Sequence, residues 1–204
     1  MAAKLAFNIG QQNFELVRDR LAVIIKEELD NQASAGRQNN TELTGSVVIE
    51  RYSPASEGEG TVICINTDSC EYADQTPISQ SNEARFFVDI SSDHKAESTA
   101  NGYELSGKKN ARIAGLIRAI LQNPVYDRLS FANGIIERRS VRNIRFARVN
   151  DEQDAYYTRM SRVEVLVKMN EPVQGISVNP QDGYDSNIKI ESTTKGFKLT
   201  YTKT

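Results

Sequence analysis

Residues 134–172 read GIIERRSVRNIRFARVNDEQDAYYTRMSRVEVLVKMNEP, which contains two extended runs joined by an acidic segment. The first run, Ile135 to Val149, is rich in apolar and β-branched residues and predicts a long strand. The second run, Arg162 to Met169, alternates valines with other residues and predicts a shorter strand. The segment between them, Asn150 to Thr158, is polar and acidic, so we expect it to connect the two strands.

Two amphipathic helices are predicted upstream of this stretch. From Asn13 to Asn31 apolar residues recur at the spacing of one helical face, and Asn13 is suited to cap the helix. The second helix starts with Asn101 and Glu104 in capping-box spacing and ends at Asn123-Pro124, because proline disfavours a helical residue before it. The apolar stripes are Phe14, Val17, Leu21, Ile24, Ile25 and Leu29 in the first helix and Ile113, Leu116, Ile117, Ile120 and Leu121 in the second.

Three further strands are predicted between the helices, because β-branched and aromatic runs alternate there with turn residues. These runs are Ser46 to Tyr52, Thr61 to Asn66, and Arg85 to Ile90. The connection Pro54 to Gly60 is suited to a hairpin tip, whereas the longer polar stretch Asp68 to Glu83 predicts an exposed excursion.

The composition changes after Glu171-Pro172, where Gly, Pro, Asn and Asp dominate before the run IKIESTTKGFKLTYT. That run predicts a β-hairpin turning near Lys195-Gly196. We therefore expect a domain over residues 1–171 and a C-terminal extension with a hairpin arm over residues 172–204. The fold class is α+β, an antiparallel or mixed sheet with both helices packed on one face.

The overall charge excludes a globally basic protein, because 25 Lys and Arg residues are balanced by 27 Asp and Glu residues. The sequence contains no signal-peptide h-region and no bilayer-spanning apolar run, which predicts a soluble, non-exported protein that does not contact a membrane. Cys64 lies in an apolar run and Cys70 in a polar one, so we expect two reduced thiols.

Residues for catalysis, cofactors or metals do not form a recognisable constellation. Gly102 to Lys108 meets the G-x-x-x-x-G-K spacing of a phosphate-binding loop, but Lys109 stands where magnesium needs a hydroxyl. His94 is the only histidine and lies in a polar stretch typical of a solvated loop. The acidic pairs Glu27-Glu28 and Asp151-Glu152 lie on polar faces, where solvated charge is the ordinary interpretation. We expect no catalytic, cofactor-binding or metal-binding residues, and no enzyme.

The strongest local feature is a run of arginines opposed within its span only by Glu137. On one regular strand its members would divide between two faces, so a bulge or bend is needed to align them. One interpretation is an exposed strand edge protected by charge. The other is a surface that contacts phosphate backbones, because guanidinium groups match phosphates well. The run consists of Arg138, Arg139, Arg142, Arg145 and Arg148.

The order of these elements, together with residues 134–172, resembles the tail-terminator and neck (head–tail completion) proteins of tailed bacteriophages. The resemblance spans Phe14 to Glu171 and includes the stretch Gln122 to Leu129 (QNPVYDRL) leading into Phe131. Three segments exceed a minimal member of that family: the Gln32 to Thr41 loop, the Asp68 to Glu83 stretch and the residues after Pro172.

The resemblance implies a virion structural protein that assembles as a homo-oligomeric ring, commonly a hexamer, at the head-proximal end of a phage tail or neck. Such a ring terminates tail-tube assembly and joins tail to head, so its partners are tail-tube and neck or connector proteins. It also implies assembly in the host cytoplasm, no cofactor, and arginines that line a channel and contact DNA non-specifically.

Two other functions stay open. One is a nucleic-acid-binding module that uses Arg138 to Arg148, for which DNA binding falls steeply with salt. The other is a hydrolase that uses His94 as its base.

Overall fold

The computed structural model describes residues 11–35, 45–51, 59–75, 79–93, 99–132, 134–148, 158–172, 187–193 and 196–202. The chain divides into two compact units. One unit spans Gln11–Val173, and the other contains the C-terminal hairpin.

A mixed five-stranded sheet forms the framework of the first unit, with the strand order β1-β2-β3-β5-β4. The pairs β2·β3, β3·β5 and β5·β4 are antiparallel, whereas β1 runs parallel to β2. The edge strands are therefore β1, which is short, and β4, which is long. The strands are β1 Ser46–Ile49, β2 Thr61–Gln75, β3 Ser79–Ser92, β4 Ile136–Arg148 and β5 Arg159–Pro172.

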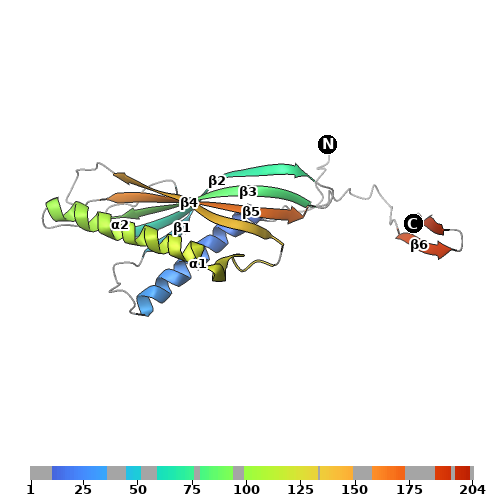
Figure 1. Ribbon diagram of the computed structural model, residues 1–204, viewed down its shortest axis with the longest axis horizontal. Coiled ribbons are helices and arrows are strands. Elements are labelled where there is room, and N and C mark those ends of the chain that lie inside the picture. Colours follow the sequence, from blue (N-terminus) through green and yellow to red (C-terminus); the bar gives the residue numbers. More distant parts are fainter. Residues whose placement is uncertain are drawn as a thin grey trace. The chain divides into compact units, whose positions relative to one another are not determined.

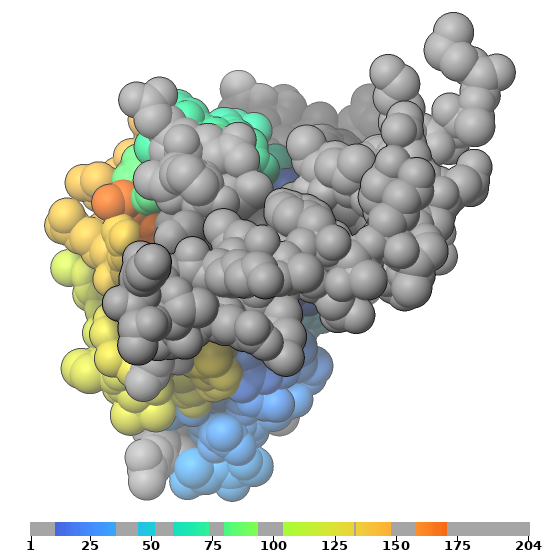
Figure 2. All heavy atoms as spheres, turned by 90° about the vertical axis from the view of Figure 1, so that its right-hand side faces the viewer, coloured from blue at the N-terminus to red at the C-terminus, as the bar shows by residue number. Residues whose placement is uncertain are grey.

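Both helices pack on the same face of this sheet (Figure 1). Helix α1, Asn13–Ser34, covers β1 and β2, and helix α2, Thr99–Gln122, covers β3, β5 and β4. A short 3₁₀ helix, η2, Pro124–Tyr126, follows α2 directly. In the end-on view of Figure 2, β2 (teal) and β4 (yellow to orange) reach the surface at separate places, with β3 and β5 between them in the sheet. The predicted α+β class with two helices on one face is confirmed.

The core lies between the helices and the helix-covered face of the sheet. The predicted apolar stripe of α1 is buried from Val17 to Leu29, and alternate residues of β3 and β5 meet it and α2. Phe86 on β3 is the largest fully buried side chain among the described residues. The other alternate residues of β3 and β5 point away from the helices. The helix-free face of the sheet therefore carries mostly polar and charged side chains.

The helix boundaries differ slightly from the prediction. The residue that precedes α1 is Gln12 and not Asn13, and the Gln12 backbone N–H donates to the Glu15 carboxylate over 2.7 Å. Helix α2 begins at Thr99, before the predicted start at Asn101. Its end at Gln122 is confirmed, because Pro124 starts the 3₁₀ helix instead of continuing α2.

Two expectations about the strands are wrong. The connection Pro54 to Gly60 is not a hairpin tip, because the strands it joins are parallel. The stretch Asp68 to Glu83 is not an excursion, because β2 and β3 continue through most of it as paired strands. Residues in this part alternate between two faces that are both polar, so no apolar periodicity marks them as strand.

The second unit contains the predicted hairpin. Strand β6, Asn187–Thr193, pairs antiparallel with β7, Gly196–Thr202. The pairing runs from Asn187 opposite Thr202 to Thr193 opposite Gly196, which confirms the predicted turn position.

Candidate functional site

The candidate site is the edge strand β4, which carries all five arginines of the predicted basic run. Strand β4 is held to the sheet by β5 on one side and by apolar residues that face the helices. Ile136 is buried, and Val141 and Ile144 pack against the core. On its other side, no strand pairs with β4 among the residues that the structure describes. Its outer backbone groups are therefore available to a partner.

Two irregularities in β4 set the directions of its arginines. The register against β5 shifts between Ile136 and Arg138 and again between Val141 and Asn143. Each shift inserts one residue and changes which later residues share a face. As a result, Arg138 lies opposite Lys168 and Arg145 opposite Arg162, on the face away from the helices. Arg142 lies at the second irregularity, and all three arginines are exposed.

Arg139 faces the helices instead and is half-buried. Its guanidinium donates to the carbonyl of Asn123 over 3.2 Å and to the carbonyl of Tyr126. These carbonyls belong to the turns that follow α2, where the Asn123 carbonyl also accepts the Tyr126 N–H and the Tyr126 carbonyl the Leu129 N–H. Burial lowers the pKa of Arg139, and the nearby Asp127 carboxylate opposes that shift. Arg139 therefore fixes the end of α2 and does not share a surface with Arg138 and Arg145.

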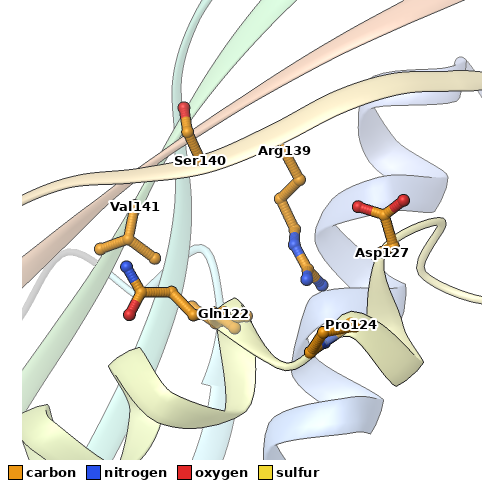
Figure 3. A pocket seen from close by; sticks show the side chains of 7 residues that line it. Gln122, Pro124, Asp127, Arg139, Ser140 and Val141 are labelled. Carbon is orange, nitrogen blue, oxygen red and sulfur yellow. The ribbon is translucent and has the colours of Figure 1, made fainter.

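A hollow of ≈ 620 Å³ lies beside Arg139, between β4 and the end of α2. Figure 3 shows the Arg139 side chain directed from β4 toward Pro124 and Asp127, while Ser140 points to the other side of the strand. The lining combines apolar side chains such as Leu121 and Val141 with the polar groups of Gln122 and Asp127. The guanidinium inside this hollow is already committed to protein carbonyls.

The helix-free face beside β4 carries a network of ion pairs. Arg162 makes two bonds to the Asp89 carboxylate, at 2.6 and 2.9 Å, and lies 4.2 Å from the centre of the Phe87 ring. Glu164 accepts a hydrogen bond from Asn143 over 2.6 Å and lies 3.4 Å from the Arg85 guanidinium. The carboxylates nearest the basic strand are thus already partnered. Among the described residues, Arg138, Arg142 and Arg145 form no ion pair.

The fifth arginine, Arg148, lies opposite Arg159 at the end of β4, and its side chain is outside the described part of the structure. The structure thus brings Arg138 and Arg145 to one face, adds Arg142 at an exposed irregularity, and separates Arg139 from them.

An acidic strip that no sequence pattern had indicated lies at the other side of the sheet. Strand β1 pairs with β2 only from Val62 to Ile65, and no described strand covers the outer edge of β2 beyond it. That part of β2 carries the exposed Asp68 and Glu71, and Glu71 lies directly opposite Glu83 on β3. The polar residues of this part of β2 were the only sign of the strip in the sequence. Because the segment has no apolar face, its sequence resembled that of a loop.

The other chemical features support no reaction site within the described residues. Those residues contain no cluster of three or more His, Cys, Asp or Glu side chains that could hold a metal ion. Residues 102–108 lie inside α2, where Lys108 pairs with Glu104, so they do not form a phosphate-binding loop. His94 and the acidic pair Asp151-Glu152 lie outside the described residues. Glu28 accepts a hydrogen bond from the Tyr126 hydroxyl.

Cys64 and Cys70 are both free cysteines. Cys64 is buried, and burial raises the pKa of its thiol. No described helix is both long enough and apolar enough to cross a bilayer.

Comparisons with known proteins leave the family open. No family model matches the sequence, and no curated protein matches it. A solved structure described as "Virion of native gene transfer agent (GTA) particle" is similar at 18% sequence identity, over 70% of this chain and 92% of that chain. Its TM-score of 0.36 is too low to establish a common fold.

Proposed function

We propose that this protein is a virion structural protein that forms a ring at the head-proximal end of a phage tail or neck. The observation that carries the proposal is the order of elements from α1 to β5: a helix, three strands, a second helix and two strands. This is the order on which the resemblance to tail-terminator and neck-completion proteins rests. The ring, commonly a hexamer in that family, ends tail-tube growth and presents a surface to which the head attaches.

The surface of the described unit suits an assembly role. Its sheet has two accessible edges of different chemistry, one basic and one acidic, and a closed core on its helix-covered face. Contacts between different surfaces of identical subunits produce closed rings when the rotation between subunits closes. Such a subunit needs neither a cofactor nor a catalytic group, because its function depends only on the shape of the ring and on the contacts between subunits.

Localisation within the particle tests this function. Antibodies raised against the purified protein and coupled to gold are expected to label the junction between head and tail in electron micrographs. Particles produced without the chain are expected to have tails of irregular length that are separate from heads. Normal tails joined to heads in the absence of the chain would overturn the proposal.

The hairpin arm has its own test within this proposal. Removing the residues after Val173 is expected to leave the sheet and both helices intact, because β5 ends at Pro172 and the hairpin belongs to the other unit. If the arm joins the ring to a neighbouring component, the truncated protein assembles as a ring but fails to bind tail tubes. A truncated protein that still binds them excludes this use of the arm.

The nucleic-acid-binding module remains the second candidate, because Arg138, Arg142 and Arg145 are exposed and form no ion pair among the described residues. It predicts that the isolated protein retards DNA in a gel and that retardation falls steeply as salt increases. Unretarded DNA at low salt would exclude it. The hydrolase hypothesis is excluded if His94→Ala changes neither folding nor any property of the assembled particle.

A further inference from the structure

The two accessible edges of the sheet carry opposite charges. Strand β4 presents Arg138, Arg142 and Arg145, whereas the outer half of β2 presents Asp68 and Glu71. Among the described residues Glu71 and Glu83 form no ion pair, although Glu83 lies opposite Lys168, and Asp68 has only a distant contact of 3.7 Å with Arg85. The charges are therefore separated to opposite sides of one sheet.

One row of residues across the helix-free face shows this separation directly. Reading from β2 to β4 through the strand register, the row is Glu71, Glu83, Lys168 and Arg138. Like charges that lie directly opposite each other on neighbouring strands destabilise a sheet by up to about 1 kcal/mol. Lys168 relieves one of these pairs by binding Glu137 over 2.8 Å. Glu71 at one end of the row and Arg138 at the other are left without a described partner.

A second row of residues across the sheet also leaves an arginine of β4 without a carboxylate partner. Arg145 lies directly opposite Arg162, whose guanidinium is already bound to Asp89 by two hydrogen bonds. Asp89 also accepts a bond from Asn66 over 3.1 Å. No carboxylate in this row is therefore left for Arg145, and a partner that brings acidic side chains to β4 would supply one.

The position of Glu50 defines where the acidic edge begins. Its carboxylate accepts a bond from the Thr67 backbone N–H over 3.0 Å and lies 3.1 Å from Arg18. These contacts occupy the outer edge of β2 as far as Thr67. From Asp68 onward, no described strand pairs with this edge of β2.

We infer that the β4 edge of one copy docks on the outer β2 edge, from Asp68 onward, of a second copy, with Arg145 beside Glu71 of that copy. Two β4 edges repel each other, and so do two β2 edges, so the charges disfavour a twofold dimer through either edge. Opposite edges attract, which favours head-to-tail contacts of the kind that close into a ring. This inference rests on the proposed function and names the subunit interface of the ring.

The strand directions are consistent with this contact. In one subunit β4 runs antiparallel to β2, because three successive antiparallel pairings separate them. A sheet continued from one copy to the next keeps that relation, so β4 meets the neighbouring β2 in antiparallel orientation. Because β1 already pairs with β2 from Val62 to Ile65, the neighbouring β4 reaches the edge from Asp68 onward only with its last residues, and this brings Arg145 beside Glu71. Phe146 on β4, which is 63% exposed, adds apolar surface at this edge.

Nucleic acid is the competing partner for the same arginines, and the observations favour a second copy. A DNA-binding role uses the basic edge but leaves the acidic edge without a function. It also places a polyanion beside Glu137 and Glu164, which lie next to the arginines. A second copy satisfies both edges at once.

Charge reversal tests the interface. Variant A carries Arg138→Glu, Arg142→Glu and Arg145→Glu, and variant B carries Asp68→Lys and Glu71→Lys. Each is expected to raise the dissociation constant of the assembly by roughly 10- to 100-fold, measured by light scattering over a concentration series. The matched controls are Arg118→Glu on α2 and Glu27→Lys on α1, which are exposed and lie on neither edge. They are expected to assemble like wild type.

Restoration separates an interface from a folding defect. A chain that carries all five reversals has an acidic β4 and a basic β2, so it is expected to assemble again to the wild-type mass. An equimolar mixture of variants A and B is expected to assemble with alternating copies, provided the ring has an even number of subunits. If triple substitution prevents folding in a thermal melt, the pair Arg145→Glu and Glu71→Lys is tested in the same scheme.

Several results would overturn the inference. One is full assembly of variants A and B. Another is failure of the five-reversal chain to assemble although it melts like wild type. A third is loss of DNA retardation in variant A with its mass unchanged, which assigns the arginines to nucleic acid. Gold labelling at the head–tail junction would still decide the proposed function separately, so either idea can fail while the other stands.

Discussion

Replacing Arg139 is expected to destabilise the fold far more than replacing its neighbour Arg138. Arg139→Ala removes two hydrogen bonds from a charged donor to the carbonyls of Asn123 and Tyr126. Such bonds contribute roughly 1.5 to 3 kcal/mol each, and the bond to Asn123 is exposed to water and counts for less. The expected loss is about 2 to 3 kcal/mol, or roughly 30- to 150-fold in the ratio of folded to unfolded protein.

Urea unfolding followed by far-UV circular dichroism measures this difference. Arg138→Ala serves as the matched control, because that exposed side chain makes no described contact and its loss is expected to cost less than about 0.5 kcal/mol. Arg139→Lys keeps the charge but loses the planar fork, so its stability is expected to fall between the two. Equal midpoints for Arg139→Ala and Arg138→Ala, with unchanged slopes, would refute the structural role of Arg139.

Three further predictions concern the core, the pH dependence and the thiols. Phe86→Ala is expected to cost about 3 to 5 kcal/mol in the same urea assay, because the side chain is fully buried. For Glu50, burial acts to raise the pKa, but bonds from Thr67 and Arg18 outweigh it and lower the pKa below 4.5. Its contribution is therefore complete above the unfolded pKa and is lost as pH falls through the folded pKa, so the stability gap to Glu50→Gln is expected to narrow below pH 4.5 in urea titrations at stepped pH. The Cys64 thiol is expected to resist alkylation at neutral pH in the folded protein and to react after unfolding, measured by mass spectrometry, because burial raises its pKa.

The helices and the central strands could be predicted because their apolar residues recur at a regular spacing. That spacing is three to four residues in the helices and two residues in the strands. The stripe from Val17 to Leu29 and the valines of β5 are buried in the core, as their spacing indicates. The outer halves of β2 and β3 could not be predicted in this way. Both faces of β2 are polar around Glu71, so a period of two leaves no hydrophobic signal there.

The division of the arginines was beyond sequence reasoning for a related reason. A strand with no irregularity places Arg138 and Arg142 on one face, but the inserted residue at Arg142 shifts the later part of β4 by one position. Arg145 therefore shares a face with Arg138. The partner carbonyls of Arg139 belong to a segment that meets β4 only in the folded chain. The parallel pairing of β1 with β2 is likewise a long-range property, since a short polar connection is compatible with either direction.

The assembled mass of the purified protein tests the account most directly. Light scattering over a concentration series, with and without tail tubes, compares the particle mass with the 22.8 kDa of one chain. A ring predicts a mass that rises to one fixed small multiple of the chain and then stays constant, and that falls when salt is raised because the edges are charged. A protein that remains a monomer under all these conditions, or whose mass grows without a plateau, would contradict it.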